Sequence, residues 1–405
     1  MNYDFIFNNI VGIILTILVF GFIIFIHELG HFLSAKLFGV KVEEFGMGLP
    51  PRIARLFKDK SGTIYSLNLL PIGGFVSLKG EKYDEQSVYE KDSLAGANIF
   101  KQMIIVLAGV GMNFLLACVI FSVLFTIGVQ PLYIDSKLQV NTHTKLILTI
   151  DEAINQKILK VSGLILSPIK GSIAEEAGIK EKDVLIAING KKVTKPEEMI
   201  NAVKYFDSPL TFTIIRKDSD GIAKENNIQL NPENGKIGTY IDYNYIDKDK
   251  NFTYKYPLGE AIKIGFQEGV NQTKYIFEGL KTIVLKIATP KTNLERSEAI
   301  STIGGPISLG SLFIDLISFK ANLILFVIIA ALLSLNLAIF NLLPIPALDG
   351  GRFFIMLVNG FVILIFGRKA IDERTETFIH IFGYFLLIGL SIYIAYMDIF
   401  KLFTK

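Results

Sequence analysis

The sequence predicts a polytopic α-helical membrane protein with four transmembrane helices and a small inserted α+β domain on the outer side of the membrane. Two observations predict this fold class. The 405-residue chain is 51% hydrophobic and has a mean hydropathy of +0.46, although 20% of its residues are charged. Its apolar residues are also gathered in four long uncharged runs. A soluble domain rarely combines these values, so we expect the apolar and the charged residues to lie in different parts of the chain.

The composition also excludes several classes of protein. Low hydrophobicity with high net charge is typical of disorder, and a net charge of +3 on this composition does not fit it. The 41 basic and 38 acidic residues are nearly balanced, so we expect no nucleic-acid partner. A single cysteine excludes an intramolecular disulfide framework and any cysteine-cluster zinc or iron–sulfur site.

The predicted spans are the four uncharged runs at 5–26, 104–128, 323–348 and 378–397. Each is near or above the roughly 20 residues that cross a bilayer core as a helix. A fifth apolar run at 353–366 is shorter and contains Asn359 and Gly360. We therefore expect a partly immersed segment there instead of a fifth span.

The distribution of basic residues predicts the orientation of these spans. Four spans place both termini on one side of the membrane. The loops at 32–101 and 349–377 carry most of the lysines and arginines that lie close to the spans. The positive-inside rule therefore assigns these loops to the cytoplasm and the long segment 130–322 to the exterior.

We expect four parts along the chain, because hydropathy and charge change near their boundaries. They are an N-terminal membrane core at 1–130, a small domain at 131–240, an amphipathic helical linker at 241–320 and a C-terminal membrane core at 321–405.

The small domain should contain several strands and two helices. Asn189-Gly190 between two apolar stretches is a strong hairpin signal. Thr194 with Glu197 three residues later predicts a capping box at the start of a helix. The later stretch 258–287 mixes apolar and charged residues at helical spacing. We expect there an amphipathic helix that lies on the outer membrane surface or packs on the small domain.

The residues that carry chemistry begin at the end of the first span. His27-Glu28-Leu29-Gly30-His31 fits the pattern H-E-x-x-H. Residues four apart share a helix face, so both imidazoles could bind one Zn²⁺ while Glu28 stands beside a water molecule. The alternative is that these residues lie at the membrane interface by chance. Polar side chains at the end of an apolar helix are costly without a partner, which favours the metal site.

Asp349 is the best candidate for the third protein ligand that a catalytic zinc requires. The third span ends at Asp349 on the same side as the first span ends at His31. The alternative role of Asp349 is an N-cap of the following segment. Pro344 and Pro346 break the helix just before it, which a bilayer tolerates only where the backbone is buried in protein or lines a wet cavity. We expect His143 to be solvated and His380 to pack between helices.

Taken together, these motifs resemble the site-2 protease family of intramembrane zinc metalloproteases, peptidase family M50. The resemblance is greatest to the bacterial regulator-of-sigma-E protease branch, of the RseP and RasP type, and it covers nearly the whole chain. Three further motifs of the family are present in order, namely 71–76 (PIGGFV), 109–113 (GVGMN) and 304–306 (GGP).

The resemblance implies a single zinc ion per chain, held by His27, His31 and Asp349, with Glu28 as the general base. It also implies that the loop after the first span is a cytoplasmic, membrane-associated β-hairpin, and that the inserted domain is one extracytoplasmic PDZ-like module.

The resemblance further implies residues that contact the substrate. Asn113 would hold or orient it, although a helix–helix hydrogen bond is an equally good interpretation of a mid-span asparagine. The other residues implied to contact substrate are Gly73, Gly74, Phe75, Asn341 and Pro346. In the PDZ-like domain, the implied peptide-binding loop and strand are Ser162, Gly163, Leu164 and Ile165, and the alternative is an ordinary structural strand.

The implied activity is regulated intramembrane proteolysis in the bacterial cytoplasmic membrane. The substrates would be single-span proteins or peptides, such as anti-sigma factors or remnant signal peptides, and the partner surface would be the lipid bilayer. Two alternatives from other classes remain at this point. One is a membrane-anchored PDZ adaptor with no catalytic zinc, and the other is a transporter with broken helices.

Overall fold

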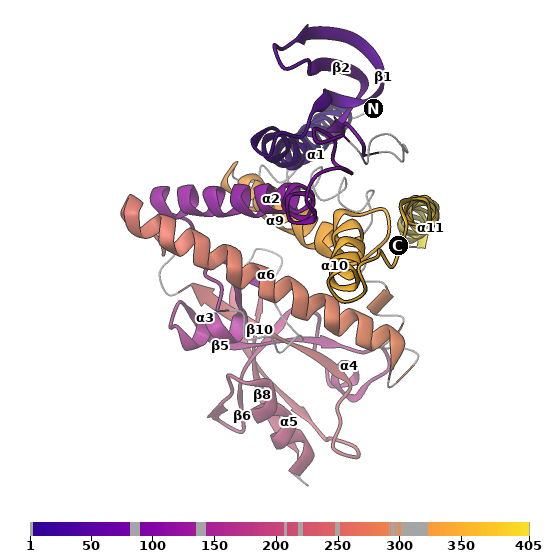
Figure 1. Cartoon of the computed structure of the whole chain (residues 1–405). Helices are drawn as coiled ribbons and strands as arrows, with labels where there is room; N and C mark the ends of the chain where they lie inside the picture. The colour runs from indigo at the N-terminus through magenta and orange to yellow at the C-terminus, as the bar shows by residue number, and fades with distance from the viewer. Residues whose placement is uncertain are drawn as a thin grey trace. The chain divides into compact units, whose positions relative to one another are not determined.

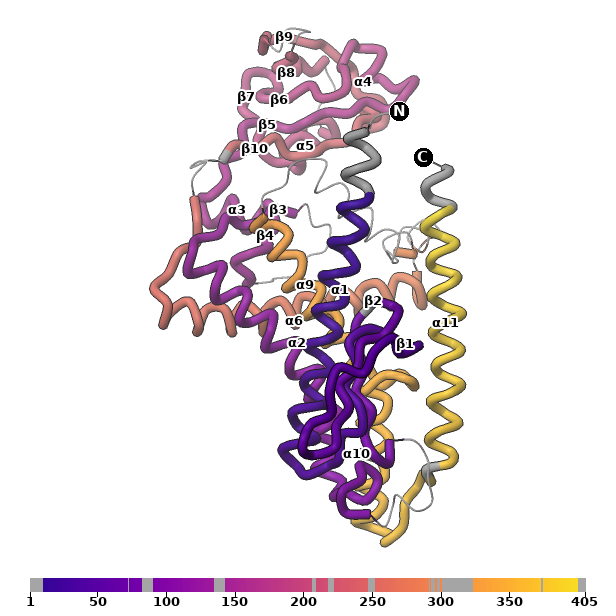
Figure 2. The backbone as a smooth tube through the Cα atoms, turned by 90° about the horizontal axis from the view of Figure 1, so that it is seen from above, coloured from indigo at the N-terminus to yellow at the C-terminus, as the bar shows by residue number. Residues whose placement is uncertain are grey.

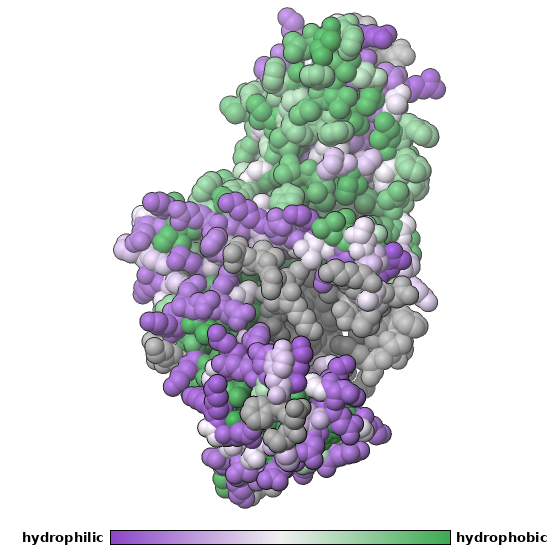
Figure 3. Space-filling view, turned by 90° about the horizontal axis from the view of Figure 1, so that it is seen from below, coloured by the Kyte–Doolittle hydropathy of each residue, from purple (hydrophilic) through white to green (hydrophobic). Residues whose placement is uncertain are grey.

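The computed structural model describes residues 3–81, 90–134, 143–205, 209–217, 222–247, 252–290 and 323–404, together with 292, 296, 299 and 300. The chain forms two compact units (Figure 1). The helical unit comprises Met1–Val129, Leu138–Thr144 and Tyr254–Lys405. The inserted unit comprises Gln130–Lys137 and Lys145–Thr253. In Figure 3 hydrophobic side chains cover much of the helical unit and hydrophilic ones cover most of the inserted unit.

The helical unit contains five helices that are long and apolar enough to cross a membrane, counted over the described residues. They are α1 (Tyr3–Leu37), α2 (Ile99–Ile127), α9 (Leu323–Leu342), α10 (Asp349–Phe366) and α11 (Glu373–Thr404). Figure 2 shows α1 and α11 running in opposite directions along roughly parallel axes.

The fifth helix, α10, is continuous where we expected an interruption at Asn359 and Gly360. Asn359 does not interrupt the helix, because its buried side chain is satisfied by the loop that leads to α11. Its Oδ1 accepts hydrogen bonds from the backbone N–H groups of Ala370 and Ile371, at 3.0 and 2.8 Å, and its Nδ2 donates to the carbonyl of Ile371. By length and composition α10 therefore qualifies as a span beside the four expected ones.

Helix α2 packs against α1 and α9, and its contact with α1 is close. A side chain at Gly30 of α1 would meet the backbone of Ala108 and the side chain of Met112, at 2.7 and 2.8 Å. On the other side, Ser334 of α9 donates a 2.9 Å hydrogen bond to the backbone carbonyl of Asn113. Small and hydroxyl-bearing residues at such crossings are typical of helices that pack in membranes.

The expected β-hairpin lies between α1 and α2 and consists of β1 (Val42–Lys58) and β2 (Ile64–Leu78). Residues 44–47 of β1 each have two partners in β2, one within 64–67 and the other within 74–77. The segment 74–77 is therefore an outer edge of this small sheet. Many side chains of the sheet are apolar and exposed, including Met47, Leu49, Ile53, Leu56, Phe57, Leu67, Leu69 and Leu70.

Two contacts fix the hairpin against α1. Lys36 at the end of the helix forms an ion pair with Asp59 in the turn, and this hydrogen bond holds the pKa of the Asp59 carboxyl below its usual range. A side chain at Gly73 would meet Ile24 of α1 at 2.7 Å, and Gly73 also has a φ of +75°. Glycine at this position therefore permits both the backbone conformation and the close approach of β2 to α1.

The amphipathic helix expected at 258–287 is α6 (Leu258–Ala288). It packs against α2 and α9, whereas we expected contacts with the membrane surface or with the small domain. Two glycines four residues apart allow the close crossing. Gly265 lies over Ser122 and Gly269 lies over Cys118, so that an added side chain would meet those residues at 2.6 and 2.5 Å.

The inserted unit is built on a sheet with the strand order β10-β5-β6-β8-β9, in which β7 also pairs with β6. All of these pairings are antiparallel, and a parallel pair, β3 and β4, precedes them. Its strands are β3 (Leu132–Ile134), β4 (Ile147–Thr149), β5 (Leu159–Pro168), β6 (Asp183–Ile188), β7 (Lys191–Lys192), β8 (Leu210–Lys217), β9 (Ala223–Leu230) and β10 (Thr239–Asp247). Its helices are α3 (Ile150–Asn155), α4 (Ile173–Glu176) and α5 (Pro196–Tyr205).

Three details of the inserted unit refine what the sequence predicts. The expected boundary at residue 240 falls inside β10, which pairs with β5 along its length. The predicted helix α5 is present, but Glu198, not Glu197, accepts the hydrogen bonds from the backbone N–H groups of Thr194 and Lys195. At the margin of the core, Arg216 binds both carboxylate oxygens of the buried Asp183, at 2.6 and 2.7 Å.

Candidate metal centre

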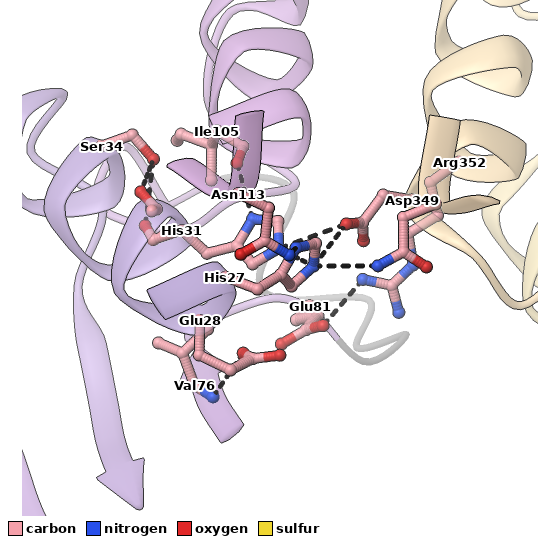
Figure 4. A network of polar contacts seen from close by, with 12 residues as sticks. His27, Glu28, His31, Ser34, Val76, Glu81, Ile105, Asn113, Asp349 and Arg352 are labelled. Carbon is pink, nitrogen blue, oxygen red and sulfur yellow. Dashed lines mark hydrogen bonds and ion pairs between the residues drawn. The ribbon is translucent and has the colours of Figure 1, made fainter. Parts of the chain in front are cut away.

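Three of the predicted site residues converge within the helical unit (Figure 4). His27 and His31 project from one face of α1, and Asp349 projects from the first turn of α10. Asp349 Oδ2 lies 2.9 Å from His27 Nε2 and 3.3 Å from His31 Nε2, and the two Nε2 atoms are 3.2 Å apart. The sequence spacing explains the histidine pair, because residues four apart share a helix face.

This triangle of donor atoms fits a zinc ion. Zinc binds imidazole nitrogen and carboxylate oxygen at about 2.0–2.1 Å in a tetrahedron, so neighbouring ligand atoms should be about 3.3 Å apart. The three observed separations lie close to that value. Asp349 Oδ2 is buried and faces only the two Nε2 atoms of the triangle, with no hydrogen bond from any other described residue, which is costly for a carboxylate oxygen unless a cation binds it. Asp349 follows the N-cap residue Leu348, so it is not itself the N-cap.

The second ring nitrogen of each histidine faces α2. His31 Nδ1 lies 2.8 Å from the carbonyl oxygen of Ile105, to which it donates a hydrogen bond. In the neutral imidazole this bond leaves Nε2 of His31 unprotonated and directed at the site, as a metal ligand requires. His27 Nδ1 lies 3.5 Å from the side-chain amide of Asn113.

Gly109 of α2 provides the space that the two imidazoles occupy. A side chain at Gly109 would lie 2.7 and 2.8 Å from ring atoms of His27 and closer still to Nε2 of His31. Contacts as short as these are essentially never seen for a real Cβ atom. The absence of a side chain at this position is therefore a condition for the geometry of the site.

Glu28 lies on α1 between the metal-ligand face and the hairpin. Its Oε2 accepts a 3.0 Å hydrogen bond from the backbone N–H of Val76 in β2. Through this bond, the edge of the hairpin sheet fixes the carboxylate beside the histidines. Glu28 is partly exposed, whereas His27 and His31 are buried.

Comparison with known proteins agrees with this geometry. The model of peptidase family M50 matches residues 15–390, nearly the whole chain. The chain belongs to peptidase family M50. A Clostridium perfringens protein provisionally named as a zinc metalloprotease is 32% identical over 96% of this chain and 98% of its own length. The zinc metalloprotease RasP of Geobacillus kaustophilus is 26% identical over 97% of this chain and 98% of its own length.

A third relative is the Enterococcus faecalis protein named as the probable protease Eep, which is 27% identical over 96% of this chain and 99% of its own length. These matches confirm the family that the motifs predict, including its RasP branch. The chain is a zinc metalloprotease of the M50 family with several apolar helices, and zinc is its cofactor.

The residues implied to contact substrate in this M50 protease lie in different places. Gly73, Gly74 and Phe75 are in the part of β2 that approaches α1. Asn341 at the end of α9 lies close to the metal-ligand triangle, with its Nδ2 3.4 Å from His27 Nε2. Pro346 lies against α11, where a side chain at Gly383 would meet its carbonyl carbon at 2.7 Å.

The implied peptide-binding residues of the inserted unit are part of its central sheet. β5 lies between β10 and β6, and residues 164–166 have backbone partners on both sides. Leu164 is completely buried, and Ser162 exchanges hydrogen bonds with Asn244 of β10. A strand with partners on both edges cannot accept a third, so the geometry favours the structural-strand interpretation for Leu164 and Ile165. Gly163 is paired with β10 only, so this argument does not extend to Ser162 and Gly163. The motif at 304–306 lies outside the described residues.

Sequence reasoning missed two contacts that support the Asp349 segment of the M50 protease. Arg352, one turn after Asp349, forms a 2.7 Å ion pair with Glu81, which follows β2 (Figure 4). His380 of α11 accepts a 2.9 Å hydrogen bond at Nδ1 from the backbone N–H of Ala347, whose φ is +77°. His380 therefore stabilises the loop before Asp349, which is more specific than the helix packing that we expected. No local pattern in the sequence pairs these segments.

Proposed function

We propose that this M50 metalloprotease is an intramembrane endopeptidase that hydrolyses a peptide bond of a single-span substrate within the membrane. The observation that carries the proposal is the position of the metal-ligand triangle. Its three side chains come from α1 and α10, which are apolar enough to span a membrane, and none comes from the inserted unit. Polar and ionisable side chains in such helices are costly and are therefore expected to serve a function.

In the proposed mechanism, His27, His31 and Asp349 hold the zinc ion. Bound there, zinc supplies Lewis-acid chemistry by polarising a carbonyl oxygen and by making water acidic enough to lose a proton near neutral pH. The missing side chain at Gly109 leaves the space beside α2 that the two imidazoles occupy.

Glu28 acts as the general base. Its carboxylate takes a proton from the attacking water and later gives the proton to the nitrogen of the leaving amine. The N–H of Val76 supports this role, because it fixes one carboxylate oxygen and so sets the direction of the other. The same hydrogen bond stabilises the charged form of the carboxylate.

The substrate is proposed to pair with the outer edge of the hairpin sheet. A transmembrane helix hides its peptide bonds in its own hydrogen bonds, so the segment to be cut must unwind and find new backbone partners. The segment 74–77 is an outer edge of the sheet, and one of its N–H groups already reaches Glu28. A substrate strand beside this segment would bring its peptide bonds to the general base, and Asn341, whose Nδ2 lies 3.4 Å from His27 Nε2, would contact it beside the triangle.

The proposed orientation puts the metal-ligand triangle near the cytoplasmic face of the bacterial cytoplasmic membrane. The basic loops at 32–101 and 349–377 support it. The opposite directions of α1 and α11 support the same side of the membrane for both termini, which requires an even number of crossings and so leaves α10 out of the count. The inserted unit would then be extracytoplasmic and would select substrates whose exterior part has been trimmed, such as anti-sigma factors or remnant signal peptides.

Cleavage of a single-span test substrate in reconstituted membranes tests this proposal. Glu28→Gln should retain one zinc per chain and lower the cleavage rate by at least about 100-fold, because the amide cannot take a proton. Asp349→Ala should lose both zinc and activity. Glu278→Gln, which alters an exposed glutamate of α6, is the matched control and should behave as the wild type. Cleavage by the purified Glu28→Gln variant at the wild-type rate would refute the mechanism.

A further inference from the structure

Asn113 occupies a position that suggests a different role from contact with substrate. It lies on α2 and is completely buried, so a substrate could reach its side chain only after a rearrangement of the surrounding helices. Its backbone carbonyl is held by Ser334 of α9, which fixes the residue between the two helices. Its side-chain amide lies beside His27 Nδ1, on the side of the ring that faces away from the other donor atoms.

The protonation of His27 decides how this contact must be arranged. A neutral imidazole that gives Nε2 to a metal carries its proton on Nδ1 and needs a hydrogen-bond acceptor there. Asn113 Nδ2 lies 3.5 Å from His27 Nδ1, which would place two donors face to face. Meanwhile Asn113 Oδ1 is buried and has no hydrogen-bond partner among the described residues. Rotating the Asn113 amide by half a turn exchanges Oδ1 and Nδ2, so that Oδ1 faces His27 Nδ1. This removes the contact between two donors and gives Oδ1 a partner, and the two orientations have nearly the same shape.

We propose that Asn113 is a positioning residue for zinc, whose side-chain oxygen accepts the Nδ1–H hydrogen bond of His27. This inference rests on the proposed role of His27 as a zinc ligand. The arrangement at His31 supports it, because His31 Nδ1 donates to the carbonyl of Ile105 on the same helix. Residues 105 and 113 are about two helical turns apart and share one face of α2. That face therefore supplies an acceptor for each of the two histidines, one from the backbone and one from a side chain.

Two isosteric substitutions of Asn113 separate this role from contact with substrate. Asn113→Asp retains an acceptor oxygen for His27 but cannot donate a hydrogen bond to a substrate carbonyl when ionised. Asn113→Leu retains the shape and removes the acceptor. The experiment is competition for zinc between the purified full-length protein in detergent and a chromophoric chelator. Thermal unfolding of the metal-free proteins shows whether each variant is folded.

Asn113→Leu should bind zinc about 10- to 100-fold more weakly than the wild type, as is typical when a partner of a metal-binding histidine is removed. Asn113→Asp should remain within a few-fold of the wild type. Unchanged zinc affinity in Asn113→Leu would overturn the inference. Equal losses of affinity in both variants would also overturn it, since the acceptor would then not be what matters.

His27→Ala in the same assay separates a failure of this inference from a failure of the proposed function. Loss of zinc in His27→Ala combined with unchanged affinity in Asn113→Leu would leave the ligand role standing and overturn only the role of Asn113. Unchanged zinc affinity in His27→Ala would overturn both. An increase in KM with unchanged zinc affinity, in both Asn113 variants, would assign Asn113 to the substrate and refute the inference.

Discussion

Replacing Gly109 by alanine tests whether the metal centre depends on the missing side chain. Gly109 lies in the middle of α2, where alanine is ordinarily the better helix former by about 1 kcal/mol. From helix propensity alone, the substitution should therefore stabilise the protein. The structure predicts that the folded variant instead loses its zinc, because the new methyl group would occupy the space of the two imidazoles.

The expected size of the effect follows from the distances. The added carbon would lie 2.7 and 2.8 Å from ring atoms of His27, and ordinary contacts of this kind begin at 3.4 Å. At least one ring must therefore move by about 0.6 Å or more, while a zinc–nitrogen bond is only about 2.0–2.1 Å long. A metal–ligand distance tolerates a change of only about 0.2 Å, and loss of a mere partner of a ligand already costs about 10- to 100-fold, so we expect zinc affinity to fall at least about 100-fold. The rings are side-chain ends that can turn aside, so the fold should survive.

The assay measures zinc per chain and zinc affinity in the purified protein, with thermal unfolding of the metal-free form alongside. Gly111→Ala is the matched control. It lies two residues away on the same helix, and nothing lies within 4 Å of the position that its side chain would take. This control should retain full zinc affinity and gain up to about 1 kcal/mol of stability. Full zinc occupancy and normal cleavage in Gly109→Ala would refute the argument.

Three further predictions concern contacts outside the metal-ligand triangle. Arg352→Gln should lower kcat/KM about 10-fold with zinc content unchanged, because it removes the ion pair with Glu81. A double variant that exchanges the arginine and the glutamate should recover part of the activity. No recovery would contradict a role for the ion pair itself. Arg216→Met should destabilise the inserted unit by about 2 kcal/mol, because it leaves the buried carboxylate of Asp183 without its bidentate partner. Amide hydrogen exchange in β6 and β8 measures this loss of stability, and unchanged protection would contradict the prediction. Gly265→Val should separate α6 from α2 and expose α6 to protease, because the valine side chain would meet Ser122 of α2 at 2.6 Å. Gly279→Ala is the control on the same helix: its side chain would meet nothing within 4 Å, and it should have no effect.

The sequence alone was sufficient for the features that depend on local periodicity. Apolar runs of membrane-spanning length predict the long helices, and H-E-x-x-H places two imidazoles on one helix face. Helix α6 was also predictable from its own pattern of apolar and polar residues, whereas the hairpin was predicted through the family resemblance. The sequence prediction differs from the structure at α10, because a polar residue within this apolar run forms hydrogen bonds to a segment outside the run. Asn359 is satisfied by the loop before α11, and nothing near it in the sequence indicates this.

The tertiary structure decided which residues surround the two histidines. It put Asp349 within 3.3 Å of both, a contact that the sequence suggested only through membrane topology and family resemblance. It also brought Gly109 into contact with both imidazoles, the N–H of Val76 to the Glu28 carboxylate, and the Asn113 amide to His27 Nδ1. These contacts join segments far apart in the chain, and they depend on where helices and strands pack. Local periodicity determines which face of a helix is polar, but only packing determines what that face meets.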